Sequence, residues 1–204
     1  MKTGAPPFRR RFTSLVAVGI LALLVTACTG RGGGQLPPDN LVFKGAASFG
    51  FDFSCEDSGG LNPPTGQLRI QLSYTEHGSS LIGSPFSIHG IVDEIDPVLE
   101  SEVCIGQNPP PGGQELIFLG RFRLASSPPP PGYPATCPAR ETKTSPLCRF
   151  EVIVRDNDGN LAPSTGDYFS IQLSSATALT SELDPLYVFY ARAGFLQGGN
   201  ITVN

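Results

Sequence analysis

Apolar and polar residues alternate with a period of two through most of the chain after residue 45. The alternation is clearest at residues 48–53, 67–74, 150–155 and 169–173. Such a pattern is typical of antiparallel strands with one face on a core and the other in water. Weaker strand-like segments are Phe86–Ile95, Leu116–Leu124, Tyr187–Leu196 and Ile201–Val203, and Gly90, Gly120 and Gly194 interrupt the first three. These glycines indicate bulges or bends.

No window outside residues 1–27 shows a convincing helical period, and the 20 prolines and 24 glycines fall mostly between the strand-like segments. Turns need these two residue types, so their placement agrees with the strand assignment. We predict one all-β domain over residues 28–204. Its expected form is an antiparallel up-and-down barrel of about eight strands, and a two-sheet β-sandwich is the alternative.

Residues 1–27 have a different pattern. Lys2 and Arg9–Arg11 precede an apolar run of 11 residues, Leu15–Val25, and a short segment of small residues follows. This order is that of a secretory signal peptide, and a membrane-spanning helix would need about 20 apolar residues. The arginines also match part of a twin-arginine export signal, so the export route stays open.

The signal ends in Val25-Thr26-Ala27-Cys28, which resembles the lipobox of bacterial lipoproteins. The resemblance implies cleavage before Cys28, a diacylglycerol thioether on its sulfur and acylation of the new amine. Two or three acyl chains hold a protein on a membrane far more firmly than one. No Asp follows Cys28, which favours the outer membrane if the host has one.

Removal of residues 1–27 leaves 177 residues, with 10 Lys and Arg against 18 Asp and Glu, a net charge of −8. Such an acidic chain is a poor partner for nucleic acid or for anionic lipid. We therefore expect the lipid anchor to be the link to the membrane.

Four cysteines remain besides Cys28: Cys55, Cys104, Cys137 and Cys148. An even number in an exported chain predicts two disulfides, and the absence of a CxxC pair disfavours zinc. If the strands run up and down, Cys55 and Cys104 lie in connections at one end of the sheet. Cys137 and Cys148 share one connection at the other end. We therefore predict Cys55–Cys104 and Cys137–Cys148.

Short motifs follow one another in a suggestive order along the mature chain: Gly32-Gly-Gly-Gln-Leu36, Ala47-Ser-Phe-Gly-Phe51, Gly66-Gln-Leu-Arg-Ile70, Tyr74-Thr-Glu-His-Gly78, Val154-Arg-Asp-Asn-Asp-Gly159, Asp167-Tyr-Phe-Ser-Ile171 and Gly198-Gly-Asn-Ile-Thr-Val203. Together they resemble a β-rich module of bacterial surface proteins that often follows a choice-of-anchor domain. The resemblance implies a β fold and a surface location, and it points to no particular enzymatic activity. Glu76 stands where this pattern has Asp, and residues 100–148 carry an insertion.

Asp156, Asp158, Asn160 and Asp167 form the most notable polar cluster, since oxygen ligands at such spacing can surround Ca²⁺. The glycine is fourth in the loop and the twelfth position is Asp, which departs from the known calcium loop. Asp158-Gly159 is also a strong hairpin signal. The hypotheses of a plain hairpin and of a calcium loop both stand.

Enzyme chemistry has little support in the sequence. Asp57-Ser-Gly-Gly60 matches the nucleophile motif of trypsin-like proteases, but both histidines, His77 and His89, come after the serine. A glycine-rich turn explains the motif better. We predict a non-catalytic, membrane-anchored envelope or surface module that binds an unknown envelope or extracellular protein. A carrier of a small apolar ligand in a barrel interior is the alternative.

Overall fold

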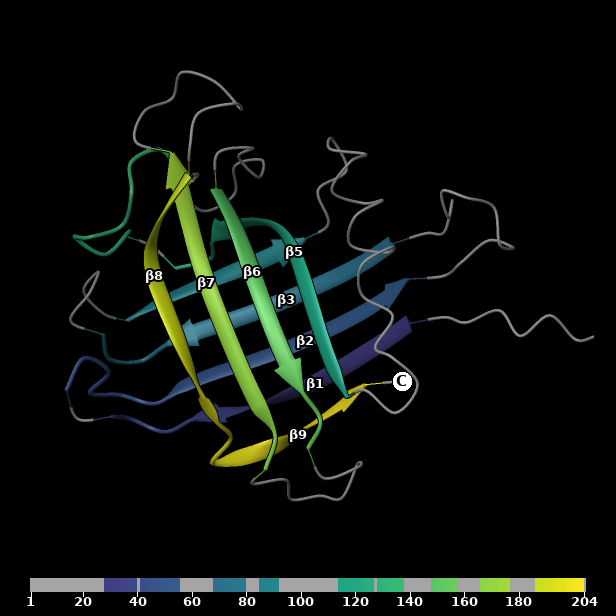
Figure 1. Ribbon diagram of the computed structural model, residues 1–204. Helices are drawn as coiled ribbons and strands as arrows, with labels where there is room; N and C mark the ends of the chain where they lie inside the picture. Colours follow the sequence, from purple (N-terminus) through teal and green to yellow (C-terminus); the bar gives the residue numbers. More distant parts are fainter. Residues whose placement is uncertain are drawn as a thin grey trace, which may run out of the picture.

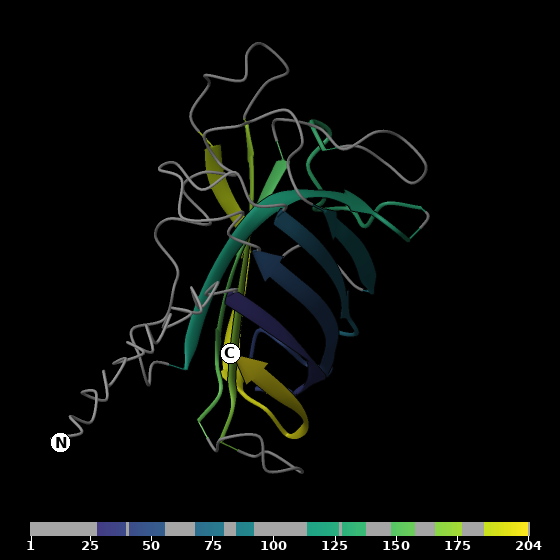
Figure 2. The ribbon, with the colours of Figure 1, turned by 90° about the vertical axis from the view of Figure 1, so that its right-hand side faces the viewer.

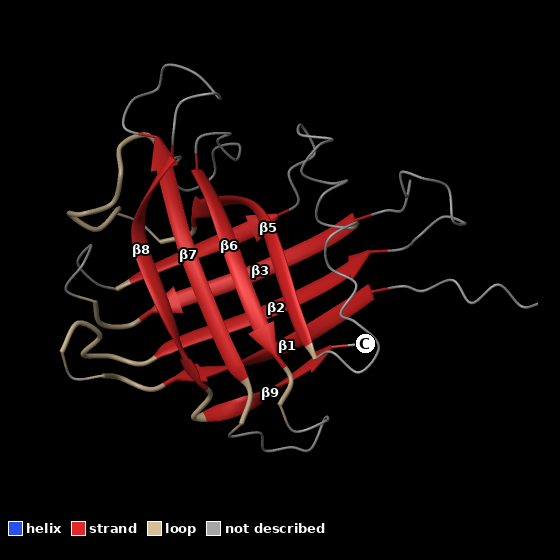
Figure 3. Ribbon diagram, in the orientation of Figure 1, coloured by secondary structure: helices blue, strands red, loops and turns tan. Residues whose placement is uncertain are grey.

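The computed structural model describes residues 28–39, 41–55, 68–79, 85–91, 114–126, 128–137, 148–157, 166–176 and 186–203. All regular elements within these ranges are β-strands, and every pairing between them is antiparallel (Figure 3). The predicted all-β antiparallel fold is confirmed. The strands are β1 (Cys28–Leu36), β2 (Ala47–Cys55), β3 (Leu68–Glu76), β4 (Phe86–Ile91), β5 (Glu115–Leu124), β6 (Cys148–Arg155), β7 (Tyr168–Ala176), β8 (Leu186–Phe195) and β9 (Gly198–Val203).

The strands form one continuous sheet in the order β8-β7-β6-β5-β4-β3-β2-β1-β9. From β1 to β8 each strand pairs with the next one along the chain, which is the up-and-down order that was predicted. The sheet curls on itself, so that β6–β8 cross over β1–β3 at a steep angle (Figure 1). The described residues therefore form a half-barrel, with β8 and β9 as its two edges.

Strand β5 joins the two layers of the curled sheet. Its first part, Glu115–Arg121, pairs with β6, and its last part, Arg121–Leu124, pairs with β4. The strand changes partner at Gly120 and Arg121, where three consecutive residues, Gly120–Phe122, are buried. The bend is visible as an arc over the other strands in Figure 2. Gly120 thus marks a bend, as predicted.

The other two interrupting glycines do not mark bulges. Gly90 stays in phase in β4, and Gly194 pairs in regular register with Phe169. The register shift in β8 falls instead opposite Leu173 and Ser174. Gly90 serves packing, because a Cβ there would lie 2.5 Å from the Phe150 ring.

Aromatic rings from both layers meet inside the half-barrel. The ring centroids of Phe49 in β2 and Phe169 in β7 lie 3.7 Å apart, and Phe118 in β5 contacts both Phe51 and Phe53. These rings are at most 7% exposed. Direct contact across the layers leaves no space for a ligand at this level of the interior. Burial of large rings is the main favourable term of such a core.

Strand β1 was not predicted, because four of its nine residues are glycine and glycine is a poor strand former. The structure shows why glycine is needed. A Cβ on Gly32 would lie 2.7 Å from the Asn200 carbonyl oxygen, and one on Gly34 would lie 2.6 Å from that of Gly198. Strands β1 and β9 approach so closely here that side chains cannot fit between them. This added strand raises the number from about eight to nine.

Candidate functional site: a polar trough on the outer sheet face

The described residues hold polar groups in two settings, inside the curl and on its outer face. The inner groups lie at what we call the seam, where the edge strands β8 and β9 meet other parts of the curled sheet. These strands do not pair, although only Leu196 and Gln197 separate them in the chain. The corner is tight, and Gly199 adopts a φ of 114°, which suits glycine alone. The seam therefore needs other bonds to hold it.

A buried ion pair between Glu76 of β3 and Arg192 of β8 supplies part of these bonds. Arg192 Nη1 donates to Glu76 Oε2 at 2.5 Å, and Tyr190 Oη donates to the same oxygen at 2.6 Å. Tyr74 Oη and Tyr190 Oη also share a hydrogen bond of 2.5 Å. Glu76 is 0% exposed and Arg192 is 3% exposed. The cluster joins β8 to β3, across the interior of the half-barrel.

The remaining hydrogen-bonding groups of this cluster are used as well. Arg192 Nη2 donates to the Leu36, Pro37 and Gly45 carbonyl oxygens, so it also ties β8 to the connection between β1 and β2. Glu76 Oε1 accepts the Gly78 N–H at 2.8 Å. A buried ion pair is tolerated when its lone pairs and protons are satisfied in this way. We conclude that the cluster is a structural clamp.

The environment of the cluster fixes the protonation of its tyrosines. Burial raises the pKa of Tyr74 and of Tyr190 far above the ordinary value for a phenol, and the negative charge of Glu76 adds to the effect. Both phenols therefore stay protonated and donate or accept hydrogen bonds as neutral groups. Neither is poised to act as a base.

Phe43 covers the clamp, with its ring centroid 4.5 Å from Arg192 Cζ. The Asp39 carboxylate positions Phe43, because Asp39 Oδ1 accepts the N–H groups of Leu41, Val42 and Phe43. These bonds lower the pKa of the Asp39 carboxyl, and the bond from the Phe43 N–H has the largest effect. The sequence pattern gave no sign of this clamp, although Glu76 is one position where the chain departs from the motifs that it otherwise resembles.

Two of the predicted calcium ligands hold the other part of the seam. Asp156 and Asp167 follow β6 and precede β7, and both are at most 1% exposed. Asp167 Oδ2 accepts the Ile201 N–H at 2.7 Å, and its Oδ1 accepts the Asn157 N–H at 3.0 Å. Asp156 Oδ2 accepts the Val203 N–H at 3.4 Å. The carboxylates thus cover the free edge of β9 with hydrogen bonds.

The calcium hypothesis itself stays a prediction. Asp158 and Asn160 lie outside the described residues. Among those that are described, no group of three or more His, Cys, Asp or Glu side chains could hold a metal. Asp156 and Asp167 accept hydrogen bonds from backbone N–H groups, which gives both residues a structural role.

The structure joins Cys137 to Cys148 by a disulfide, with their Cα atoms 5.5 Å apart. This is one of the two predicted pairs. The other predicted pair, Cys55–Cys104, has Cys104 outside the described residues. The backbone of Cys28 begins β1, and its Cα partner across the ladder is Cys55.

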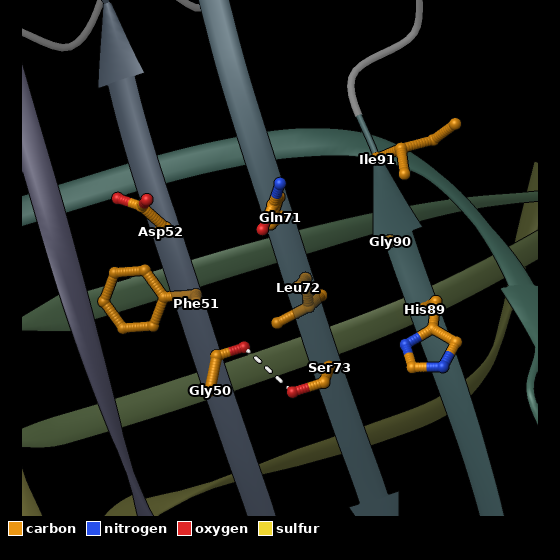
Figure 4. A pocket seen from close by; sticks show the side chains of 9 residues that line it. All are labelled: Gly50, Phe51, Asp52, Gln71, Leu72, Ser73, His89, Gly90 and Ile91. Atoms are coloured by element: carbon orange, nitrogen blue, oxygen red, sulfur yellow. Dashed lines mark hydrogen bonds between the residues drawn. The ribbon is translucent and has the colours of Figure 1, made fainter.

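The outer face of β1–β4 carries the second set of polar groups. A hollow of about 430 Å³ lies over β2, β3 and β4 (Figure 4), and another of about 360 Å³ lies over β1 and β2. Asp52 lines both, so the two hollows adjoin, and we call them together the trough. Its outward side chains are Thr29, Arg31, Asp52, Ser54, Gln71, Ser73, His89 and Ile91, and Gly50 lies on its floor.

The side chains of this trough are largely uncommitted. No hydrogen bond or ion pair joins Arg31, Asp52, Gln71 or His89 through its side chain to another residue in the described ranges. The exception is Ser73, whose hydroxyl donates to the Gly50 carbonyl oxygen at 3.4 Å (Figure 4). The trough therefore offers a guanidinium, a carboxylate, an amide and an imidazole to a partner.

This arrangement does not form a nucleophile and base. Ser73 and His89 are cross-strand neighbours, but the serine hydroxyl bonds the Gly50 carbonyl and not the imidazole. Asp52 is separated from His89 by strand β3. The geometry of a Ser–His–Asp triad is thus not present at this place. The other histidine, His77, lies 3.2 Å from the Ser48 hydroxyl, and residues 57–60 are outside the described ranges.

Comparison with known proteins adds nothing to these observations, since no family model, curated protein or solved structure matches the chain. Within the described ranges there is no helix with the length and apolar character to cross a membrane.

Proposed function

We propose that this chain is a lipid-anchored, non-catalytic envelope protein that binds a partner through the outer face of β1–β4. The observation that carries the proposal is the division of polar groups. Inside, Glu76, Tyr190 and Arg192 bond one another. In the trough, the exposed side chains of Arg31, Asp52, Gln71 and His89 form no hydrogen bond or ion pair with another described residue. A hollow that combines apolar lining with a few polar groups open to a partner is typical of a binding site. The partner is expected to be an envelope or extracellular protein.

The anchor is supported by the sequence pattern of residues 1–28. Cys28 immediately precedes the outer-face residue Thr29 and heads a strand of the sheet. The folded domain would therefore sit against the membrane with almost no linker. The outer membrane is the expected location if the host has one.

A carrier function gains no support, because rings from the two layers touch inside the half-barrel. An enzymatic function gains no support from the trough, because the Ser73 hydroxyl is bonded to a backbone carbonyl oxygen.

Mass spectrometry of the protein from intact cells tests the anchor. We expect an N-terminal peptide beginning at Cys28 with a thioether-linked diacylglycerol, and loss of membrane association in Cys28→Ser. A Cys28–Cys55 disulfide in the native protein would contradict the proposal.

A photo-crosslinking residue at Ser73, compared with one at Gln172 on the outer face of β7, tests the binding surface. Both sites are solvent-facing positions of central strands. We expect one discrete crosslinked species from position 73 in intact envelopes and none from position 172. Equal crosslinking from both positions would contradict a role for the trough.

A further inference from the structure

The hollow over β1 and β2 differs from the rest of the trough in its charges and in its place. It is lined by Thr29, Gly30, Arg31, Asp52, Phe53 and Ser54. Arg31 and Asp52 are direct cross-strand partners, so their Cβ atoms lie about 5 Å apart on the same face. A cation and an anion therefore stand side by side, with the hydroxyls of Thr29 and Ser54 next to them.

Arg31 and Asp52 do not neutralise each other in this structure, since no ion pair joins them among the described residues. Both side chains are exposed. The set offers donors for an anion, from the Arg31 guanidinium and two hydroxyls, and a carboxylate for a cation. A ligand that carries an anion and a cation a few ångströms apart would satisfy all of them.

The hollow also lies beside the anchor. Arg31 is three residues beyond Cys28 in an extended strand, which places it at most about 10 Å from the acylated residue. The head-group layer of a bilayer is about 5 to 8 Å thick on each side, which is similar to the distance between Arg31 and the proposed anchor. Phosphate with a neighbouring ammonium is the charged part of a zwitterionic phospholipid.

We propose that the hollow lined by Arg31 and Asp52 binds the head group of a zwitterionic phospholipid next to the anchor. Arg31 and the two hydroxyls hold the phosphate, and Asp52 holds the ammonium. This inference rests on the proposed lipid anchor. It orients the domain, because the β1–β2 end of the outer face then lies on the membrane while Gln71, Ser73 and His89 remain open to a partner.

The acidic character of the chain favours a zwitterionic lipid over an anionic one. Residues 28–204 carry a net charge of −8, and Asp52 would repel a head group that lacks an ammonium. Phosphatidylethanolamine is therefore expected to occupy the hollow, and phosphatidylglycerol to occupy it less.

NMR spectra of the acylated protein in nanodiscs test the proposal. A spin label on the lipid head group broadens the amide signals of residues that lie close to it. In phosphatidylethanolamine we expect the broadening to be strongest at Thr29, Arg31, Asp52 and Ser54. Arg31→Ser should reduce the broadening at Asp52 and Ser54 by about threefold, the size of an exposed charge interaction. Lys44→Ser removes one positive charge from an exposed side chain at the opposite end of β1 and should change nothing.

Equal patterns in Arg31→Ser and Lys44→Ser, or equal broadening in phosphatidylglycerol, would overturn the proposal. The mass of the Cys28 peptide in the same sample shows whether the anchor is present, so a missing anchor contradicts the proposed function separately.

A second arm does not need the anchor. Phosphoethanolamine titrated onto the full-length Cys28→Ser chain should shift the amides of Arg31 and Asp52 at millimolar concentration, and Arg31→Ser should weaken binding. If these amides shift with an envelope glycan fragment and not with phosphoethanolamine, the hollow is a sugar site and the lipid assignment is wrong.

Discussion

The Glu76–Arg192 clamp and the Arg31–Asp52 hollow both place a carboxylate near a guanidinium, and they use the pair in opposite ways. In the clamp, the two groups are buried and bond each other. Their other hydrogen-bond donors and acceptors pair with tyrosine hydroxyls and backbone carbonyls. In the hollow, the two groups are cross-strand neighbours in water and bond nothing that is described. A buried charge without a partner costs much folding free energy, whereas an exposed charge is solvated by water and costs little. The difference separates residues that hold the fold from residues available to a ligand.

Breaking the clamp should give the largest effect on stability. Arg192→Met leaves the Glu76 carboxylate buried without its partner, which typically costs about 3 to 5 kcal/mol. Arg155→Met is the matched control, since it breaks the exposed Arg155–Glu115 pair and should cost less than about 1 kcal/mol. Urea unfolding of both variants measures the difference. Equal costs would show that the clamp is no more important than a surface pair.

Removal of the Cys137–Cys148 bridge should come next. The bridge closes a loop with a sequence separation of 11 residues, for which chain entropy gives about 3 kcal/mol. The Cys137→Ser, Cys148→Ser double variant should therefore unfold at lower urea concentration than the oxidised wild type. Reduced wild type should match the reduced variant, because any bridge between Cys55 and Cys104 is then broken in both. A variant as stable as the oxidised protein would show that the bridge lies in a region already held by other contacts.

The buried aspartates at the seam provide a third test. Asp167→Ala removes the acceptor of the Ile201 and Asn157 N–H groups, and loss of hydrogen bonds to a charged group costs about 1 to 3 kcal/mol. If this role is purely structural, the loss is the same with and without calcium. Asp158→Ala tests the calcium hypothesis, which requires a fall in thermal stability only when Ca²⁺ is present. Equal behaviour of Asp158→Ala in both conditions would reject the metal site.

The sequence predicted the elements whose side chains alternate, and it missed what depends on contacts between distant strands. Strands β2, β3, β6 and β7 follow directly from period-two burial, because one face of each lies on the core. The Cys137–Cys148 bridge followed from the order of the strands. The clamp could not be predicted, since Glu76 and Arg192 are 116 residues apart and each looks like an ordinary charged strand residue. The trough depends on the register of four strands, which a single sequence does not determine.

Strand β1 is another element that depends on contacts between distant strands. Its glycine run looks like a linker in the sequence, and only the contact with β9 explains it. Gly34→Ala should destabilise by about 1 to 3 kcal/mol, since the new Cβ would collide with the Gly198 carbonyl oxygen. Gly50→Ala is the control on the outer face, where the nearest atom to a Cβ is Ser73 Oγ at 3.4 Å. It should be neutral or stabilise by up to about 1 kcal/mol. The two melting temperatures, measured side by side, decide whether close approach explains the glycine run.

The smallest effects on stability are expected in the trough. Gln71→Ala and His89→Ala remove exposed side chains that bond nothing described, so the free energy of unfolding should change by less than about 0.5 kcal/mol. Their effect should appear instead in crosslinking from position 73, whose yield should fall in both variants. A loss of stability with unchanged crosslinking would contradict the distinction between clamp and trough, because it would show that the outer side chains also stabilise the sheet. Unchanged stability with reduced crosslinking would place partner recognition on this face, where nothing in the fold requires these side chains.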